Sequence, residues 1–430
     1  MIRKTDLEFV REPLAAPFGF KGRYLSELWQ TVALVESDRF RAVCPAVESV
    51  LWSDAGVFSA NPPAASSAMM LLVTGRALKM LEGERIERPD AVVPELVPEL
   101  MRYAAAVCGR PVAETFVLNA LVGVDYALWM LYALENGISD FDRLIPEAAR
   151  AALHCRQDAL AHIPLISYDV GEDALRAVLD GGTALLKIKI GRMAAPPGAD
   201  RETDMREMLA WDCRRLSEIH AVAGQYETDL TRDGKVHYYL DANGRYDTLE
   251  RLNALLEHAE KIGALGRISL LEEPFEAENE RDVHGLPVVV NADESAHSVA
   301  DVRRRLALGY RAVALKPIAK TMSVSFEMAA CIHAAGGQCL CADLTVNPLL
   351  ALWNMQFAAR TEALDGLRCG CVEVNGDQNY ARWEALCALL PDGMRFQAAR
   401  AGRFALDEDF YAKSGLLFGA NGYARYFAAR

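Results

Sequence analysis

The sequence predicts an α/β protein in which a closed parallel barrel follows a smaller α+β domain. After about residue 160, short apolar strands alternate with amphipathic helices, an order typical of a parallel barrel. Before that point, strand-like segments are followed by a block of helices, which is typical of an α+β domain. The chain has 430 residues, 52% of them hydrophobic, which is too much for one compact core of ordinary size.

The composition limits the kind of protein and its partners. A net charge of -13 argues against a nucleic-acid partner, and we interpret Arg303 to Arg305 as a solvated helix face. The N-terminus lacks a signal-peptide pattern, and no uninterrupted apolar segment is judged long enough to span a bilayer. The ten cysteines suit a reducing compartment, and we interpret the two C-x-C pairs as core packing and not as a zinc site. We therefore expect a cytoplasmic protein without a membrane partner.

The first half of the chain contains the elements of the α+β domain. Leu7 and Phe9 alternate with polar neighbours, and residues 31–36 and 40–50 flank a turn, so we expect an antiparallel meander. Three helices are expected between about residues 64 and 136, because apolar-periodic segments there are separated by proline and glycine.

The second half contains eight candidate barrel strands. Because both faces of a parallel strand are buried, near-continuous apolar runs identify them. The long link 191–235 is expected to hold one helix around 205–223, and the apolar tail from about residue 401 is expected to pack on the first domain. The strands are 163–168, 184–190, 236–241, 268–272, 288–291, 312–316, 338–342 and 371–375.

Charged residues lie at the ends of several of these strands. Asp241, Glu272 and Asp293 each close an apolar run, and strand ends in a closed parallel barrel meet at one rim. Lys187 and Lys189 are two positions apart, so both face the barrel interior. An ammonium group there requires nearby carboxylates or a functional role for a lowered pKa.

This set of residues predicts a cation site with a base beside it. Three carboxylates suit Mg²⁺, whereas zinc is disfavoured because the nearby histidines do not close strands in a ligand pattern. A divalent cation would hold a substrate carboxylate and stabilise the charge that develops when the neighbouring proton is removed. A lysine with a lowered pKa would serve as the general base.

The ordered motifs resemble those of the enolase superfamily. Lys-x-Lys, Asp-Ala-Asn, Glu-Glu-Pro, Asp-Glu-Ser and a lysine follow one another on strands two to six. More narrowly, they are similar to the muconate-lactonizing branch, with its dipeptide epimerases, N-acylamino acid racemases and o-succinylbenzoate synthases. The resemblance covers most of the chain, and Ala127-Leu128-Trp129 falls where the last helix of that family's N-terminal domain has such a run.

The resemblance implies a fold and a domain organisation. The fold would be a TIM-like (β/α)7β barrel with an N-terminal α+β capping domain. The capping domain would span residues 1–160 and the modified TIM barrel residues 161–385. Residues 386–430 would pack back on the capping domain.

The resemblance also implies a role for each residue of the site. Lys189 would be a base on one face of the substrate carbon, Lys316 an acid or base on the other, and Lys187 a partner that contacts the carboxylate and tunes Lys189. Lys320 competes with Lys316, but the strand phase places Lys316 at the strand end and Lys320 in the loop. Mg²⁺ would be bound by Asp241, Glu272 and Asp293.

The seventh and eighth strands depart from related patterns. The seventh strand ends without the histidine that the mandelate racemase branch would need, so a dehydratase of that type is disfavoured. Dipeptide epimerases usually carry Asp-x-Asp on the eighth strand to hold an ammonium group, whereas this chain has Glu373 and Asn375.

Further residues are expected around this centre. The loop 18–24 would cover the site, with Phe20 and Arg23 as candidate substrate-binding residues and a basic side chain paired with a distal carboxylate. Asn243 and Glu294 are expected to orient the metal ligands.

The leading hypothesis is abstraction of the proton α to a carboxylate through an enediolate, in a racemase or epimerase of an amino-acid derivative or dipeptide. The alternative is a cycloisomerase or lyase of the muconate-lactonizing or o-succinylbenzoate synthase type. A Schiff-base aldolase and a non-catalytic metal-binding protein are remote alternatives. The partner would be a small-molecule carboxylate, and homo-oligomerisation stays open.

Overall fold

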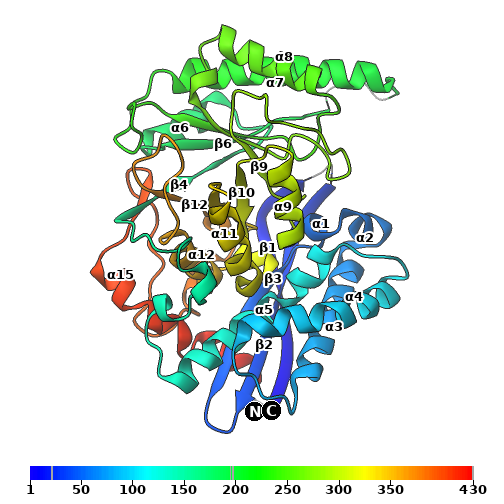
Figure 1. Ribbon diagram of the computed structural model, residues 1–430, viewed down its shortest axis with the longest axis vertical. Helices are drawn as coiled ribbons and strands as arrows, with labels where there is room; N and C mark the ends of the chain where they lie inside the picture. The colour runs from blue at the N-terminus through cyan, green and yellow to red at the C-terminus, as the bar shows by residue number, and fades with distance from the viewer. Residues whose placement is uncertain (21–22, 194, 196–197, 429–430) are drawn as a thin grey trace.

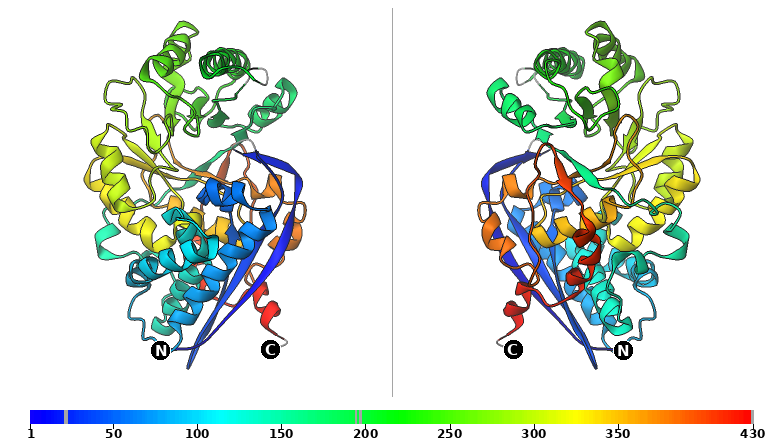
Figure 2. Two further views of the ribbon diagram at one scale, coloured as in Figure 1. Left: turned by 90° about the vertical axis from the view of Figure 1, so that its right-hand side faces the viewer. Right: turned by 90° about the vertical axis from the view of Figure 1, so that its left-hand side faces the viewer.

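The computed structural model describes residues 1–20, 23–193, 195 and 198–428. The chain first forms a three-stranded sheet with helices, and then a barrel whose strands alternate with helices (Figures 1 and 2). The predicted fold class, an α/β barrel with an N-terminal α+β part, is therefore confirmed.

The N-terminal part is an antiparallel sheet packed on helices, which we call the cap. Its strands are β1 (Ile2–Phe20), β2 (Arg23–Ser37) and β3 (Arg41–Glu48), with β2 in the middle. Seven of the eight residues of β3 are buried, because the strand packs on a helix of the cap. The helices are α1 (Val50–Ser53), α2 (Ala55–Ala60), α3 (Pro63–Leu81), α4 (Val92–Cys108) and α5 (Glu114–Asn136).

Helix α5 is the central helix of the cap. Among the described residues, it is the one helix that by length and composition could cross a membrane. By that test, the expectation that no apolar segment is long enough to span a bilayer is wrong. However, 89% of the residues in its apolar segment are buried within the protein, which is typical of the core helix of a globular protein. It packs on β2 and β3 on one side and on the barrel segment α10 (Pro317–Lys320) on the other.

The barrel strands follow one another around a closed circuit. The neighbour order is β4-β12-β11-β10-β9-β8-β7-β6-β5, and β4 and β5 are consecutive in the chain across Pro164, so the two ends of the order meet. All these pairs are parallel. The bounds are β4 (Ala159–Ile163), β5 (Leu165–Ile166), β6 (Leu185–Lys189), β7 (His237–Asp241), β8 (Ile268–Glu272), β9 (Val290–Ala292), β10 (Ala312–Leu315), β11 (Gln338–Cys341) and β12 (Gly370–Glu373).

The first strand differs from its prediction. It was expected to begin at Ile163, but it begins at Ala159 and is divided at Pro164. Proline has no N–H group to donate to a neighbouring strand, which explains the division. The carbonyl of Pro164 still accepts a hydrogen bond of 3.0 Å from the backbone N–H of Lys187, so the sheet continues across the division.

Helices cover the outside of the barrel (Figure 1). The described residues of the long link between β6 and β7 contain one long helix, as expected, and it begins four residues earlier than predicted. The helices between the strands are α6 (Glu172–Asp180), α7 (Arg201–Ala223), α8 (Leu249–Lys261), α9 (Val299–Ala307), α11 (Met322–Ala334) and α12 (Pro348–Ala358). After the last strand come α13 (Gly376–Asn379), which contacts β1 of the cap, α14 (Trp383–Cys387) and α15 (Glu408–Ala412).

The C-terminal tail runs from the barrel to the cap. Strand β13 (Arg403–Ala405) pairs antiparallel with β4. Further on, the Asn421 side-chain amide donates a 2.8 Å hydrogen bond to the carbonyl of Val43 in β3, and the Ser414 hydroxyl accepts one of 3.1 Å from the backbone N–H of Phe141.

Candidate active site

The interior of the barrel explains which side chains reach the site. An apolar cluster fills its centre and includes Leu185, Tyr239, Leu270, Ala314 and Cys371. Side chains two positions further along each strand share the same face. Those positions carry Lys187, Asp241, Glu272, Lys316 and Glu373, which therefore point into one pocket at the carboxyl ends of the strands.

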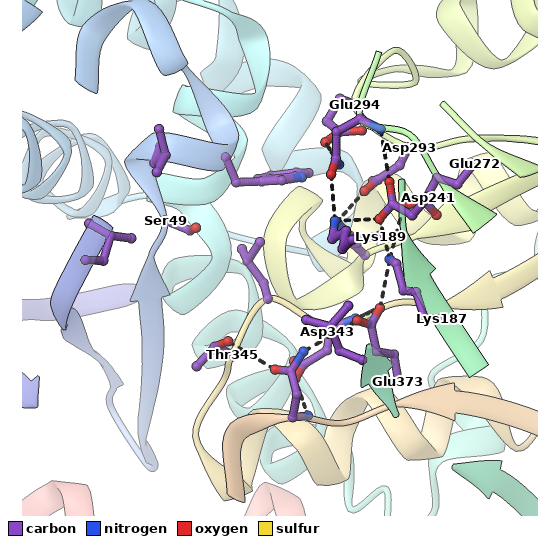
Figure 3. A pocket seen from close by; sticks show the side chains of 18 of the residues that line it. Ser49, Lys187, Lys189, Asp241, Glu272, Asp293, Glu294, Asp343, Thr345 and Glu373 are labelled. Atoms are coloured by element: carbon purple, nitrogen blue, oxygen red, sulfur yellow. Dashed lines mark hydrogen bonds and ion pairs between the residues drawn. The ribbon is translucent and has the colours of Figure 1, made fainter. Parts of the chain in front are cut away.

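The two lysines of β6 are bound to carboxylates. The Lys187 ammonium lies 3.0 Å from Glu272 Oε1, 3.2 Å from Asp241 Oδ2 and 3.3 Å from Glu373 Oε2. Lys189 donates to Asp241 Oδ2 at 2.6 Å and to Asn243 Oδ1 at 2.7 Å. Figure 3 shows Lys187 between the upper carboxylates and Glu373.

The carboxylates set the protonation of Lys187. Burial alone would lower its pKa, but Glu272, Glu373 and Asp241 raise the pKa well above its ordinary value. Of the two explanations that we expected for an interior lysine, the structure therefore shows carboxylate pairing for Lys187.

Two lysines from the segment after β10 also bind Asp293. Lys316 is bound to Asp293 Oδ2, and Lys320 donates to the Asp293 backbone carbonyl at 2.9 Å. Burial opposes the charge on Lys316, but Asp293 raises its pKa, whereas burial lowers the pKa of Lys320. Lys316 follows β10 directly and lines the pocket, as the strand phase predicted, and Lys320 does not line it. The expected loop around Lys320 is wrong, because this residue ends the short helix α10 (Pro317–Lys320) and is fully buried.

Glu272 has neighbours that bind one of its oxygens from within the barrel. The Tyr239 hydroxyl and the Asn291 amide both donate to its Oε2, the latter at 2.8 Å. Burial raises the pKa of Glu272 to about 7, against the opposing effect of Lys187. Asp241 differs, because Lys189 and Lys187 outweigh its burial and hold its pKa below the ordinary value.

Two residues with positive φ shape the loops beside these carboxylates. Asn243, at φ 45°, donates its side-chain amide to Glu294 Oε1 at 2.9 Å and accepts from Lys189. Glu273, at φ 40°, accepts the backbone N–H of Asp293 at 2.7 Å. These contacts fix the backbone on which Asp241 and Asp293 are presented.

A second group of acids lies across the pocket. Asp343 lies two residues beyond the end of β11, and its carboxylate accepts the backbone N–H of Asn375 at 2.7 Å. Burial and the neighbouring Glu373 raise the pKa of Asp343 to about 7. The Asn375 side chain accepts from the Thr345 hydroxyl at 3.0 Å and donates to Glu373 at 3.4 Å.

The cap closes the pocket from the other side, where Figure 3 shows Ser49. The Trp52 ring lies 4.7 Å from the ammonium of Lys316, measured to the ring centre, and 5.8 Å from that of Lys320. The remaining cap residues of the pocket are apolar side chains and one serine: Leu14, Leu25, Leu28, Ser49 and Leu51.

The chemistry of the pocket fits a divalent cation. Three lysines line it, and six carboxyl side chains face them: Asp241, Glu272, Asp293, Glu294, Asp343 and Glu373. The carboxylates outnumber the lysines, and carboxylate oxygens are the donors that Mg²⁺ prefers. Within the described part of the chain, no three acidic, histidine or cysteine side chains already surround a common point, because lysine ammonium groups lie between the carboxylates.

The structure places most of the predicted site residues around one pocket. Lys187, Lys189, Lys316, the three proposed ligands, Asn243, Glu294, Glu373 and Asn375 all line it. Phe20 and Arg23 pair in the backbone at the tip of β1 and β2, but their side chains lie outside the described residues, as does Lys21.

Sequence reasoning missed several residues of the pocket. Asp343 follows the apolar run of β11, as Asp293 follows that of β9, so the same pattern could have found it. Trp52 and the cap leucines carry no such signal, because they come from elements whose contact with the barrel is set by the whole fold.

Solved structures of similar fold are known. This chain is similar to a mandelate racemase/muconate lactonizing protein from Herpetosiphon aurantiacus, with a TM-score of 0.66, 18% identity, and 96% of this chain and 97% of that chain covered. It is also similar to the L-Ala-D/L-Glu epimerase from Bacillus subtilis, in a substrate-liganded complex, with a TM-score of 0.65, 16% identity and 94% and 96% covered.

A third similar structure is the dipeptide epimerase from Enterococcus faecalis V583 complexed with Mg and the dipeptide L-Leu-L-Tyr. The TM-score is 0.62 at 12% identity, with 94% of this chain and 99% of that chain covered. No family model and no curated protein matches the sequence. At these identities the likeness shows the fold alone, and this is the fold that the resemblance implied.

Proposed function

We propose that this chain, which has the fold of the enolase superfamily, is a Mg²⁺-dependent enzyme that removes the proton α to a carboxylate. The reaction that the pocket favours is racemisation or epimerisation of an amino-acid derivative or dipeptide. The single observation that carries this proposal is the placement of two lysines on opposite sides of one barrel. Strands β6 and β10 are separated by β7, β8 and β9 in one direction, and by β11, β12 and the divided first strand β4/β5 in the other. Lys189 and Lys316 both line the pocket between them.

Opposed lysines suit a reaction that proceeds on both faces of one carbon. Lys189 would take the proton from one face, and Lys316 would return a proton to the other, or the reverse for the opposite antipode. Lys187 is held by three carboxylates and would act as a fixed positive charge toward the substrate carboxylate.

Asp241, Glu272 and Asp293 would hold the metal ion, as the excess of carboxylates in the pocket supports. When bound, Mg²⁺ would supply positive charge for the substrate carboxylate and the enediolate, and it would favour the neutral amine of the nearby lysines. Glu373 and Asp343 would face a positively charged substrate group, since both carboxylates line the pocket. The named Mg and dipeptide of the similar epimerase structure are consistent with this proposal.

Deuterium incorporation tests the proposed function. The enzyme with Mg²⁺ would be incubated in heavy water with dipeptides and N-acyl amino acids, and the α-carbon followed by proton NMR. A racemase or epimerase exchanges the α-proton and scrambles the configuration. A cycloisomerase or lyase, the second candidate, yields a new product without scrambling, and the absence of both results with every compound would contradict the proposal.

A further inference from the structure

Glu48, the last residue of β3, is a buried acid that the proposed reaction does not use. Its exposed fraction is 3%, and neither carboxyl oxygen makes a hydrogen bond to any residue in the described part of the chain. Burial raises its pKa well above the ordinary value, and the nearby Ser67 hydroxyl only partly opposes this. A buried carboxyl group that has only one serine hydroxyl near it destabilises the fold, so its presence points to a ligand.

Glu48 lines a small chamber in the cap. A second acid, Glu27, and two aromatic rings, Trp29 and Phe58, line the same chamber, and no lysine, arginine or histidine is among its lining residues in the described part of the chain. Glu27 already accepts from Arg11 at 2.8 Å and from the Trp29 indole at 3.2 Å. Carboxylates and aromatic faces favour a positively charged group. Arg11 already pairs with Glu27 and lies 6.0 Å from the centre of the Trp29 ring, so Glu48 is the carboxylate of the chamber that is left for a ligand.

The chamber adjoins the candidate active site. Leu25, Leu28 and Leu51 line both the chamber and the pocket, so these three side chains form the wall between them. Ser49, the next residue after Glu48, lines the pocket itself, where Figure 3 shows it on the cap side. A ligand group that reaches Glu48 from the pocket therefore has to pass between these leucine side chains, which must move apart to admit it.

We propose that Glu48 determines substrate specificity by binding a positively charged group, an ammonium or guanidinium at the end of an aliphatic stem, on the distal part of the substrate. This inference rests on the proposed function, because it takes the carboxylate end of the substrate to lie among the barrel lysines. The leucines contact the stem, and Glu48 becomes ionised when the cation binds. The substrate class is then a dipeptide or N-acylated amino acid with a lysine-like or arginine-like side chain.

The test compares two dipeptides that differ mainly in the terminal charge, L-alanyl-L-lysine and L-alanyl-L-norleucine. The wild-type enzyme is expected to exchange the α-proton of the lysine dipeptide with the higher kcat/KM. Glu48→Gln should lower kcat/KM for the lysine dipeptide by about 10- to 100-fold, the range expected for a lost hydrogen bond between charged groups. Glu48→Leu should favour the norleucine dipeptide.

A second measurement separates specificity from folding. Both Glu48 variants should unfold at a higher temperature than the wild type, since each removes a buried acid without a donor. Glu36→Gln is the matched control, because Glu36 is an acid of the same sheet that pairs with Arg41 at 3.3 Å outside the chamber. It should leave the preference between the two dipeptides unchanged.

The inference is overturned if the wild type does not distinguish the dipeptides, or if Glu48→Gln affects both alike. If neither dipeptide exchanges, the proposed function has failed for this class of substrate, and calorimetry with the same dipeptides decides the role of Glu48. Tighter binding of the lysine dipeptide that is lost in Glu48→Gln supports that role, and equal or absent binding overturns it.

Discussion

The ammonium of Lys316 lies between the barrel and the cap. The barrel contributes the Asp293 carboxylate, and the cap contributes the Trp52 ring, 4.7 Å away. Lys189 is held instead by Asp241 and Asn243, on the other side of the barrel. The two lysines proposed for the reaction are therefore held in different ways.

This difference predicts an asymmetric effect of Trp52→Leu. A cation–π contact contributes about 0.5–2 kcal/mol, so its loss should slow the half-reaction that depends on Lys316 by roughly 2- to 30-fold. The half-reaction that depends on Lys189 should change less. Deuterium exchange from each antipode, measured separately, gives the ratio, and Trp52→Phe is the control that keeps an aromatic face. Equal loss for both antipodes would refute a specific role of Trp52.

At the scale of elements, the end of β6 is fixed by the glycine that lies just beyond the two lysines. Gly191 has φ 80°, and its backbone N–H donates to both oxygens of Asp212 at 2.9 Å. A Cβ at this position would lie 2.6 Å from the Cβ of Arg245. Glycine is therefore required both by the backbone conformation and by the close packing.

Gly191→Ala should destabilise the fold and displace the end of β6. We expect a loss of about 1–3 kcal/mol of unfolding free energy together with a lower kcat, because Lys189 is two residues away. Gly263→Ala is the control, since Gly263 has φ 78° and a Cβ added there would meet no described atom within 4 Å, so it has strain without a clash. Denaturant unfolding measures the stability, and deuterium exchange measures the activity. Equal losses of stability and of exchange rate in the two variants would contradict the role of close packing at Gly191.

Helix α5 joins the cap to the barrel through a buried acid. The Asp125 carboxylate accepts the backbone N–H of Met322 at 2.8 Å and that of Ser323 at 3.2 Å, at the start of α11. Burial raises the pKa of Asp125 to about 7, although these hydrogen bonds oppose the rise.

Asp125 should make stability fall as the pH rises from about 4 to 7. In this range the folded protein keeps the proton and the unfolded chain has lost it, so each pH unit favours the unfolded state. Below about pH 4 both states are protonated, and above about pH 7 both are ionised, so the effect is constant there. Asp125→Asn keeps an acceptor for the backbone and should flatten this slope. Denaturant unfolding at about pH 4.5 and 7.5 measures it, and an unchanged slope would show that another group is responsible.

At the scale of the whole molecule, the barrel could be predicted from the sequence because each strand carries its own signal. An apolar run that ends in a charged residue identifies both the strand and the residue at the rim, as for Asp241 and Glu272. The first strand was predicted at the wrong place, because Pro164 divides it into β4 and β5 and β4 lies before the predicted start.

The cap side of the pocket could not be predicted in the same way. Trp52 and Glu48 reach the site region because the β3–α1 junction is held on α5, where Asn119 accepts the backbone N–H of Ser49 at 2.8 Å and donates to the carbonyl of Val47 at 3.0 Å. Such contacts join residues about 70 positions apart, and no local pattern in the sequence encodes them.

The central claim is that Lys189 and Lys316 serve opposite faces of one substrate carbon, and antipode-resolved deuterium exchange tests it most directly. Lys189→Ala and Lys316→Ala, each with Mg²⁺ and a substrate found in the exchange screen, would be followed in heavy water by NMR. Each variant should lose exchange of one antipode by about 10²- to 10⁴-fold and retain exchange of the other. Loss of exchange of the same antipode in both variants, or full exchange of both antipodes in either, would contradict the claim.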